Sequence, residues 1–556
     1  MRVWSLVLAF GLVVTLMACA SGPDRNTSLS ALAVAVGGSD VKVTNDNGNV
    51  DGGTPTPSFD AKNVQSNETS VAISPIDAAI VAVAANDYAM APVFYDAWLG
   101  LYLSSDGGAT WFNTMVPGFP SDASAAGLAS PLHGLDLSND PTVRFDGDGN
   151  LYLSGIALNY GFDPRERPVD TVVYVAKYLY TPGTPAGTST VESAGNPPDF
   201  TYAFTTVVDR GAVGYAIPPQ QPFGVAGVFD DKSWLAIDTH QGSACYGTLY
   251  ASYTSFRGVA GAFPIVVAAS SDGGATFGQP RPITQKRRDG GLAAQGANVA
   301  VAADGTLYLA YRTFPTRSDP ETRLQLVRSD DCGKHFSAPL TAAVFQPMPA
   351  QAEGLNFRTP TLPWIAVDDA DPSTVYVAFM AVAGGSDDAD IFVTRSTDGG
   401  FTWPTPVRVN DDGTHKHQFW PTIDVSGGIL HVAWYDFRNS PNANDPTLGN
   451  DALDVYYASS ESASFPTFDP NTRITDVSHN PNCLMYFNDT VAFHGDYIEL
   501  DAVSSGATEV VHIAWTDNRD VSPCDLSPTP DYPYGAWFTG LLNQNIYADT
   551  LTVSSP

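Results

Sequence analysis

An apolar strand recurs along most of this chain and constrains its fold more than any other feature. The strand occurs in seven copies. Equivalent residues of consecutive copies are 55 to 98 residues apart. The aligned residues are Ala82, Tyr152, Tyr250, Tyr308, Tyr376, His431 and His512. A small unit repeated at such a period cannot bury its apolar faces alone, so its copies must stack on one another.

The fifth copy displays the content of one unit most clearly. The pattern predicts strands over 363–369, 374–379, 390–396 and 406–410, separated by Gly- and Asp-containing turns. Four short antiparallel strands at this period are typical of a β-propeller blade. We therefore predict an all-β fold, a β-propeller of seven blades, with six or eight as alternatives. A linear solenoid would also stack its units, but it needs capping repeats, and we find none in the sequence.

A polar octet of the pattern S-x-D-x-G-x-x-[WF] lies between the predicted third and fourth strands of four units. Its aspartates are Asp106, Asp272, Asp331 and Asp398. Ser and Asp side chains bond turn backbone, and glycine supplies positive φ. The closing aromatic residue, such as Trp111 or Trp403, can pack between blades. We expect these four aspartates to form turns and not to act as catalysts.

The octet resembles the Asp box, or bacterial neuraminidase repeat. Together with two strand ends of the form W-x-D-x-R, at 434–438 and 515–519, it makes the chain similar to the sialidase superfamily of propellers. The resemblance covers residues 61–556 and implies that the octets lie on the face opposite an active site. Asp boxes occur in propellers with several functions, so the resemblance bears on the fold and leaves the activity open.

The charge of the chain excludes one class of partner. It has 59 acidic and 27 basic residues among 556, which gives a net charge of −32. Such a surface repels phosphate backbones, so we expect no binding of nucleic acid. The sequence contains no P-loop, no dinucleotide-binding glycine motif and no CxxC pair, so we expect neither a cofactor nor a bound metal.

The N-terminus resembles an export signal. Arg2 precedes an apolar run over 3–18, and the run ends in "LMAC", which resembles a bacterial lipobox. We expect a signal peptide over 1–19 with lipidation at Cys19; ordinary cleavage after Ala18 or Ala20 is the alternative. Residues 20–60 are rich in Ser, Gly, Asn, Asp and Pro and predict a flexible tether. These features predict a monomer in the bacterial cell envelope, attached to the membrane by lipid alone and facing the periplasm or exterior.

Four further cysteines are expected to form two disulfides in an exported protein. In a propeller, hairpins one-to-two and three-to-four share one face, and loops two-to-three and blade links share the other. Cys245 and Cys332 fall in hairpins of the first kind in adjacent units, whereas Cys483 and Cys524 fall in a link and a loop of the second kind. We therefore predict the pairs Cys245–Cys332 and Cys483–Cys524.

The candidate site gathers residues from the ends of the second strands and from the blade links. The resemblance implies an arginine cluster for a substrate carboxylate, a tyrosine nucleophile with a glutamate partner, and an aspartate acid/base. On that hypothesis, the catalytic residues are Tyr497, Glu68 and Asp87. The ligand-binding residues are Arg312, Arg438, Arg519, Arg358, Asp436, Asp517, Trp434 and Trp515.

Two observations favour binding over hydrolysis. Asp436 precedes Arg438 by two residues, and Asp517 precedes Arg519 likewise, so each pair can form a local ion pair that fixes a loop. In addition, no arginine stands between Arg25 and Arg144, where the family carries its first triad arginine. We therefore expect a binding propeller for a glycan or a cell-surface protein; an exo-α-sialidase or related glycoside hydrolase is the alternative, and an envelope assembly factor is a third option.

Overall fold

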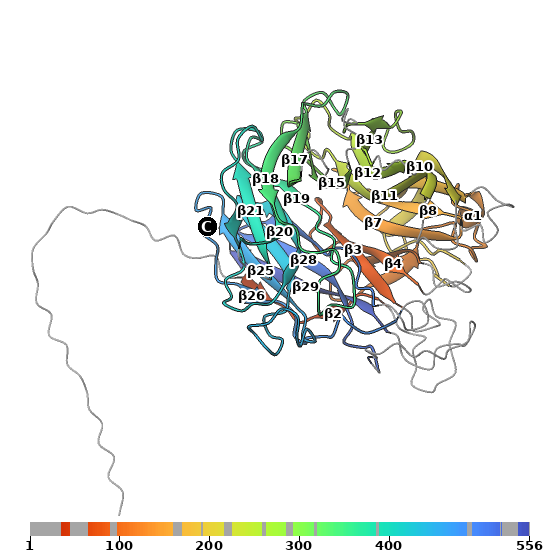
Figure 1. Cartoon of the computed structure of the whole chain (residues 1–556). Helices are drawn as coiled ribbons and strands as arrows, with labels where there is room; N and C mark the ends of the chain where they lie inside the picture. The colour runs from red at the N-terminus through yellow and green to blue at the C-terminus, as the bar shows by residue number, and fades with distance from the viewer. Residues whose placement is uncertain are drawn as a thin grey trace, which may run out of the picture.

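Strands make up nearly all of the regular structure in the computed structural model (Figure 1). The structure describes residues 35–44, 65–88, 97–159, 169–190, 193–215, 225–257, 263–284, 293–315, 320–384, 388–485, 492–522, 524 and 543–554. Among these residues the one helix, α1 (Ala125–Ala129), lies in the link between the first two blades. No helix in these ranges has the length and hydrophobicity needed to cross a bilayer.

The strands form seven antiparallel blades, as predicted, around a central channel. Blade 1 holds β3 (Ser66–Ile73), β4 (Val81–Asp87), β5 (Trp98–Ser104) and β6 (Phe112–Met115); blade 2 holds β7 (Leu137–Phe145), β8 (Leu151–Leu158), β9 (Val169–Tyr180) and β10 (Phe200–Tyr215); blade 3 holds β11 (Val225–Ile237), β12 (Leu249–Arg257), β13 (Ile265–Ser270) and β14 (Arg281–Pro282); blade 4 holds β15 (Ala294–Val301), β16 (Leu307–Thr313), β17 (Thr322–Ser329) and β18 (Leu340–Phe345).

The remaining blades complete the ring. Blade 5 holds β19 (Trp364–Val367), β20 (Val375–Val382), β21 (Ala389–Ser396) and β22 (Val407–Arg408); blade 6 holds β23 (Gln418–Ser426), β24 (Ile429–Asp436), β25 (Asp454–Glu461) and β26 (Thr472–Arg473); blade 7 holds β27 (Glu499–Ser505), β28 (Thr508–Asp517) and β29 (Asn545–Ser554). Figure 1 shows the blades following one another around the ring, from orange at β3 to blue at β29. Blades 2 and 3 also pair with each other, through β10 and β11.

The N-terminal segment closes the ring. Strands β1 (Ala35–Gly37) and β2 (Val41–Lys42) pair antiparallel with β29 and supply the outer edge of blade 7. The prediction of a flexible tether over 20–60 is therefore wrong for this part of it, because β29 offers an unpaired edge that the segment satisfies with backbone hydrogen bonds. The predicted signal peptide and Cys19 lie outside the described residues.

Apolar side chains from neighbouring blades pack together between the sheets. One cluster joins blades 1 and 2 through residues such as Leu99 and Val143, and another joins blades 4 and 5 through residues such as Leu326 and Val377. The octet residue Trp403 packs against the second cluster, and Trp111 packs where blades 7 and 1 meet. Each sheet is thus buried on both faces by its neighbours, as the repeat predicts.

The octets close the hairpins between third and fourth strands. In the octet of blade 5, Ser396 donates to Asp398 Oδ1 at 2.7 Å, and Asp398 accepts from the backbone and the hydroxyl of Thr402 at 2.9 and 2.7 Å. The Thr402 donors are the first cause that lowers the pKa of Asp398 to about 2. The same bonds recur at Asp106, Asp272 and, with a histidine in place of threonine, at Asp331. These carboxylates are occupied within their own turns.

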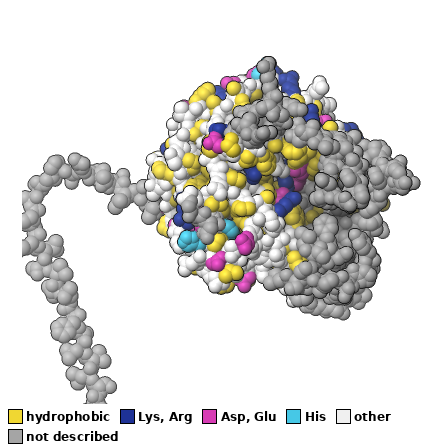
Figure 2. Space-filling model, in the orientation of Figure 1, with side chains coloured by type: hydrophobic (Ala, Val, Ile, Leu, Met, Phe, Trp, Pro, Cys, Tyr) yellow, Lys and Arg dark blue, Asp and Glu magenta, His cyan; other side chains and the backbone are white. Residues whose placement is uncertain are grey.

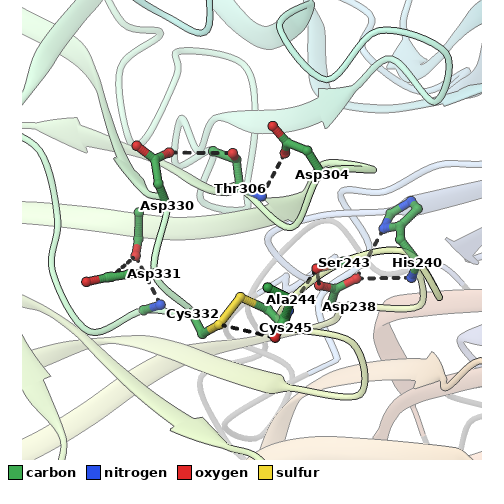
Figure 3. Close-up of a disulfide and its surroundings, with 12 residues drawn as sticks. Asp238, His240, Ser243, Ala244, Cys245, Asp304, Thr306, Asp330, Asp331 and Cys332 are labelled. Carbon is green, nitrogen blue, oxygen red and sulfur yellow. Dashed lines mark hydrogen bonds and ion pairs between the residues drawn. A yellow bond between two sulfur atoms is a disulfide. The ribbon is translucent and has the colours of Figure 1, made fainter.

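Both predicted disulfides are present. Cys245, in the hairpin after β11, bonds Cys332, in the octet of blade 4, with Cα atoms 5.4 Å apart. Figure 3 shows this bond joining the two hairpins, beside the Asp238–His240 turn. Cys483 and Cys524 form the other bond, with Cα atoms 4.9 Å apart. The sorting of hairpins and loops between two faces is therefore confirmed. We call the face that carries the octet hairpins the octet face. We call the face that carries the two-to-three loops and the blade links the opposite face.

Candidate functional site

The innermost strands of five blades share an irregularity at the end nearest the opposite face. In β3, β7, β11, β15 and β23 the register with the second strand shifts, and one residue at the shift has positive φ. These residues are Glu68, Asp140, Lys232, Gly296 and Trp420. Such a bulge removes a residue from the ladder and re-aims its side chain. Positive φ is strained for residues other than glycine, and this strain is repeated around one end of the channel.

Three of the bulge residues meet in a cluster of buried charges. The ammonium group of Lys232 lies 3.2 Å from Glu68, 3.1 Å from Asp140 and 2.7 Å from Asp496. Arg358, from the link between blades 4 and 5, lies 2.6 Å from Asp496 and 4.0 Å from Glu68. We call these five residues the ion cluster. On the face shown in Figure 2, basic and acidic side chains lie side by side near the centre of the molecule.

The three carboxyl groups of the ion cluster differ in pKa. Burial raises the pKa of Glu68 to about 8, against the attraction of Lys232. Burial opposes ionisation of Asp140 and Asp496. The charge and hydrogen bonds of Lys232, together with a hydrogen bond from Glu68, nevertheless lower the pKa of Asp140, and the charges and hydrogen bonds of Arg358 and Lys232 lower that of Asp496. A neutral carboxyl group therefore lies beside two carboxylates, an arrangement that suits hydrogen-bond donation and acceptance in one place.

Arg358 connects the cluster with the surface. Its Nε and Nη2 donate to the two oxygens of Asp496, at 2.7 and 2.6 Å, in a bidentate pair. Its guanidinium lies 5.0 Å from the ring centre of Phe493. The side chain is nevertheless 54% exposed, whereas the other members of the cluster are buried. Arg358 therefore presents the outer edge of a fixed guanidinium to the opposite face.

Two of the three predicted catalytic residues lie together. Tyr497 is buried, and the Lys232 ammonium lies 5.2 Å from the centre of its ring. Burial, followed by the charge of Glu68, raises the pKa of Tyr497 well above its usual value. Asp87 lies elsewhere, near the end of β4, where it accepts a hydrogen bond of 2.8 Å from Tyr102. The structure thus brings Tyr497 and Glu68 together and places Asp87 in a separate contact.

The two W-x-D-x-R ends form equivalent local networks. Asp436 accepts from Trp434 Nε1 at 2.9 Å and from the backbone and side chain of Arg438 at 2.7 and 2.9 Å. In blade 7, Asp517 accepts from Trp515 at 3.0 Å and from the Arg519 backbone and side chain at 2.7 and 2.6 Å.

Neighbouring strands and loops accept further bonds from these arginines, while the Nε atoms of Arg312 and Arg519 are buried without a hydrogen-bond partner among the described residues. Arg438 also reaches Asp411 at 2.8 Å, and Arg519 reaches Asp40 at 2.7 Å. Arg312 donates to the carbonyl of Thr361 at 3.1 Å, and burial lowers its pKa to about 10. Within the described residues, Arg312, Arg438 and Arg519 share no acceptor in their hydrogen bonds and ion pairs. Each is fixed in its own blade, and only Arg358 of the four predicted arginines belongs to the ion cluster.

The sequence alone does not single out Lys232 and Asp140 as partners in one site. A lone lysine usually lies in solvent, and nothing in its immediate sequence marks Lys232 as buried. One signal is available: Glu68, Asp140 and Lys232 precede the apolar part of a first strand at similar offsets in three successive units. An alignment of first strands, in addition to that of second strands, groups these three residues.

Comparison with solved structures finds chains of low similarity. Neither a family model nor a curated protein sequence matches this chain. A protein of unknown function from Dyadobacter fermentans is 13% identical over 93% of this chain and 99% of its own, with a TM-score of 0.39. Trypanosoma rangeli sialidase bound to the inhibitor DANA is 12% identical over 74% of this chain and 58% of its own, with a TM-score of 0.39. Hadza microbial sialidase Hz136 is 14% identical over 76% of this chain and 71% of its own, with a TM-score of 0.38. At these values the similarity carries no argument about fold or function.

Proposed function

We propose that the protein is a binding propeller of the cell envelope, and that it holds a glycan or protein ligand on the opposite face, at the ion cluster. We also propose that the chain is an Asp-box propeller of the sialidase superfamily and that it is exported as a lipoprotein anchored at Cys19. The observation that carries the binding function is the ion cluster itself, because charged groups from blades 1, 2 and 3 and from two blade links meet at one end of the channel.

The free-energy cost of burying these charges supports a functional role for the ion cluster. Removing charges from water costs several kcal/mol per ion, and well-packed apolar side chains often stabilise a protein as well or better. The bulges that carry Glu68, Asp140 and Lys232 add backbone strain. Buried, perturbed charges held by strained backbone at the mouth of a channel are typical of a binding or catalytic site.

Arg358 provides the contact with the ligand. Its two inner donors are occupied by Asp496, so the guanidinium cannot rotate away, while its exposed edge faces outward. A fixed guanidinium edge donates two hydrogen bonds to a carboxylate or to neighbouring hydroxyl oxygens with little loss of side-chain entropy. This geometry suits an acidic sugar or an acidic side chain of a partner.

Exo-sialidase activity receives less support. That reaction needs several arginines that converge on a substrate carboxylate, but Arg438 and Arg519 donate to the aspartates two positions before them. Tyr497 is buried beside Lys232, and its pKa is raised, which disfavours the phenolate that a nucleophile requires.

Glycoside hydrolysis of another kind is the second candidate, and one observation favours it. Glu68, with a pKa raised to about 8, lies beside the ionised Asp140 and Asp496, and glycosidases pair a protonated with an ionised carboxyl group. On this hypothesis Glu68 donates the proton to the leaving group.

Binding of the purified protein to immobilised acidic glycans and to envelope proteins tests the proposal. Arg358→Ala should abolish binding, whereas Arg281→Ala, an exposed arginine in the outer strand β14, should leave it unchanged. A ligand that binds the Arg358→Ala variant as tightly as the wild type contradicts the proposed site. Release of a fluorogenic group from a glycoside, lost in Glu68→Gln, would instead establish the hydrolase.

A further inference from the structure

One arginine of the opposite face has no carboxylate partner. Arg312 is half-buried near the end of β16, where the second strand of blade 4 reaches this face. Among the described residues it forms no ion pair, and burial alone lowers its pKa. In contrast, Arg358, Arg438 and Arg519 each pair with a buried aspartate. Since removing a charge from water without a counterion is unfavourable, Arg312 is suited to accept an anion from outside the chain.

The guanidinium of Arg312 is held by two contacts. Its Nη1 donates to the carbonyl of Thr361 at 3.1 Å, and its central carbon lies 4.3 Å from the ring centre of Phe314. Its Nε is buried without an acceptor in the described part of the chain. Its Nη2 has no acceptor there either, but it is not fully buried. The group is therefore fixed in orientation, and its Nη2 end reaches the surface with N–H donors unused.

Neutral polar groups lie beside Arg312. Gln295 is its neighbour across β15 and β16, and the amide of Gln295 donates to Asp231 at 3.4 Å. The hydroxyl of Thr361 is buried and has no hydrogen-bond partner within the described ranges. These groups can bond hydroxyl oxygens of a ligand, but they add no positive charge.

The surroundings of Arg312 adjoin the ion cluster at two points. Asp231 immediately precedes Lys232, and Thr361 follows Arg358 by three residues. Three residues span at most about 11 Å even when fully extended. Arg312 therefore contacts the same short segment that carries Arg358, the exposed arginine of the proposed ligand site.

We propose that Arg312 and Arg358 bind two separate anionic groups of one ligand, an acidic glycan that carries carboxylates on different sugar units. This inference rests on the proposed binding function and names the class of ligand. Both guanidinium groups are fixed by protein contacts, so each can bind a carboxylate with little loss of side-chain entropy.

The groups between the two arginines favour a glycan over an acidic peptide. Gln295 and Thr361 are neutral hydrogen-bonding residues, and a glycan places hydroxyl groups between its carboxylates. A run of glutamates offers a charge at every residue and no hydroxyl groups. The arrangement also differs from an arginine cluster around one carboxylate, because Arg312 shares no acceptor with Arg438 or Arg519 among the described residues.

Titration calorimetry of the full chain with two forms of trigalacturonic acid tests the proposal. One form has all its carboxylates free, and in the other all but one are methyl esters. The wild type should bind the free acid about tenfold more tightly, the value of hydrogen bonds to one charged group. Arg312→Gln should bind both forms equally, and its affinity for the ester should stay within about twofold of the wild type.

Control variants separate this role from a structural one. Arg312→Lys keeps the charge, lacks the planar fork, and should also lose the preference, so it serves if Arg312→Gln fails to fold. Arg281→Gln, in the exposed outer strand β14, should leave both affinities unchanged. An equal loss of affinity for both forms in Arg312→Gln and Arg312→Lys overturns the proposal.

The same titrations distinguish this inference from the proposed function. If Arg358→Ala abolishes binding while Arg312→Gln keeps the wild-type preference, the ligand site stands and the second anionic contact is wrong. If the wild type binds neither form, the inference is overturned together with an acidic-glycan ligand. Hexaglutamate that binds more tightly than trigalacturonate, with the same dependence on Arg312, overturns the choice of a glycan.

Discussion

Asp436 holds Arg438 by two contacts at once, accepting from its backbone nitrogen at 2.7 Å and from its Nε at 2.9 Å. The carboxylate is fully buried, and the arginine side chain is only 11% exposed. The pair turns the chain at the end of β24 and ties the following loop to the neighbouring link through Asp411. The sequence suggests Arg438 as a member of a ligand-binding arginine cluster. In the structure its contacts fix a loop.

The first prediction concerns this pair. Arg438→Ala leaves the buried Asp436 without its cation and should lower the free energy of unfolding by about 3 to 5 kcal/mol. Arg323→Ala, which removes an arginine paired with the exposed Glu321, should cost about 1 kcal/mol or less. Urea unfolding followed by tryptophan fluorescence measures both. Equal losses in the two variants would contradict the structural role of the pair.

The two disulfides are predicted to differ in their contribution. Cys245 and Cys332 are separated by 87 residues, and Cys483 and Cys524 by 41. On the chain-entropy model each bond stabilises the fold by about 4 kcal/mol, with the larger contribution from the longer loop. The double variants Cys245→Ser/Cys332→Ser and Cys483→Ser/Cys524→Ser, compared by thermal unfolding, check the order. A greater loss on removing the shorter loop would count against this account.

Glu68 should impose a pH dependence on stability. Its folded pKa is about 8 and its ordinary value is 4.5, so its contribution is fully present below pH 4.5 and is lost as the pH rises through 8. Asp140 and Asp496 have lowered pKa values and change the stability only in acid. Glu68→Gln should therefore lose less stability than the wild type between pH 5 and 8. Denaturant titrations of both proteins across this range measure the difference, and parallel curves would refute the assignment.

Tyr497 offers a direct test between binding and nucleophilic catalysis. Tyr497→Phe keeps the ring that packs against Trp234 and Trp364 and lies beside Lys232. We expect the variant to bind the ligand within about twofold of the wild type, a change of less than about 1 kcal/mol. A tyrosine nucleophile could not be replaced in this way, so loss of a glycosidase activity in Tyr497→Phe, with binding retained, would favour the enzyme.

Much of the fold could be predicted from local patterns. The seven second strands, the octet turns and the sorting of cysteines between two faces depend on short-range periodicity and on how hairpins alternate, both of which the sequence displays. The ion cluster depends on other physics. Arg358 and Asp496 are 138 residues apart, and Lys232 and Glu68 are 164 apart, so ring closure brings them together. Their burial follows from bulges with positive φ, which residues such as lysine and glutamate do not signal.

The N-terminal part of the fold escaped prediction for a similar reason. Residues 35–42 carry too few apolar side chains to mark a strand, and their pairing is backbone bonding to the free edge of β29, more than 500 residues away along the chain. Polar segments that complete a sheet edge resemble linkers in composition, and only the partner strand distinguishes the two.

The pairing of β1 and β2 with β29 gives the ring a single seam, at which the two ends of the fold meet. Asp40, beside this seam, bonds Arg519 and the backbone of Asp476. A pull on the N-terminal side of β1 would act first on these two short strands and on Asp40. The seam is then both the last part of the ring that can assemble during synthesis, since β29 is made last, and the place where mechanical tension would begin to open it.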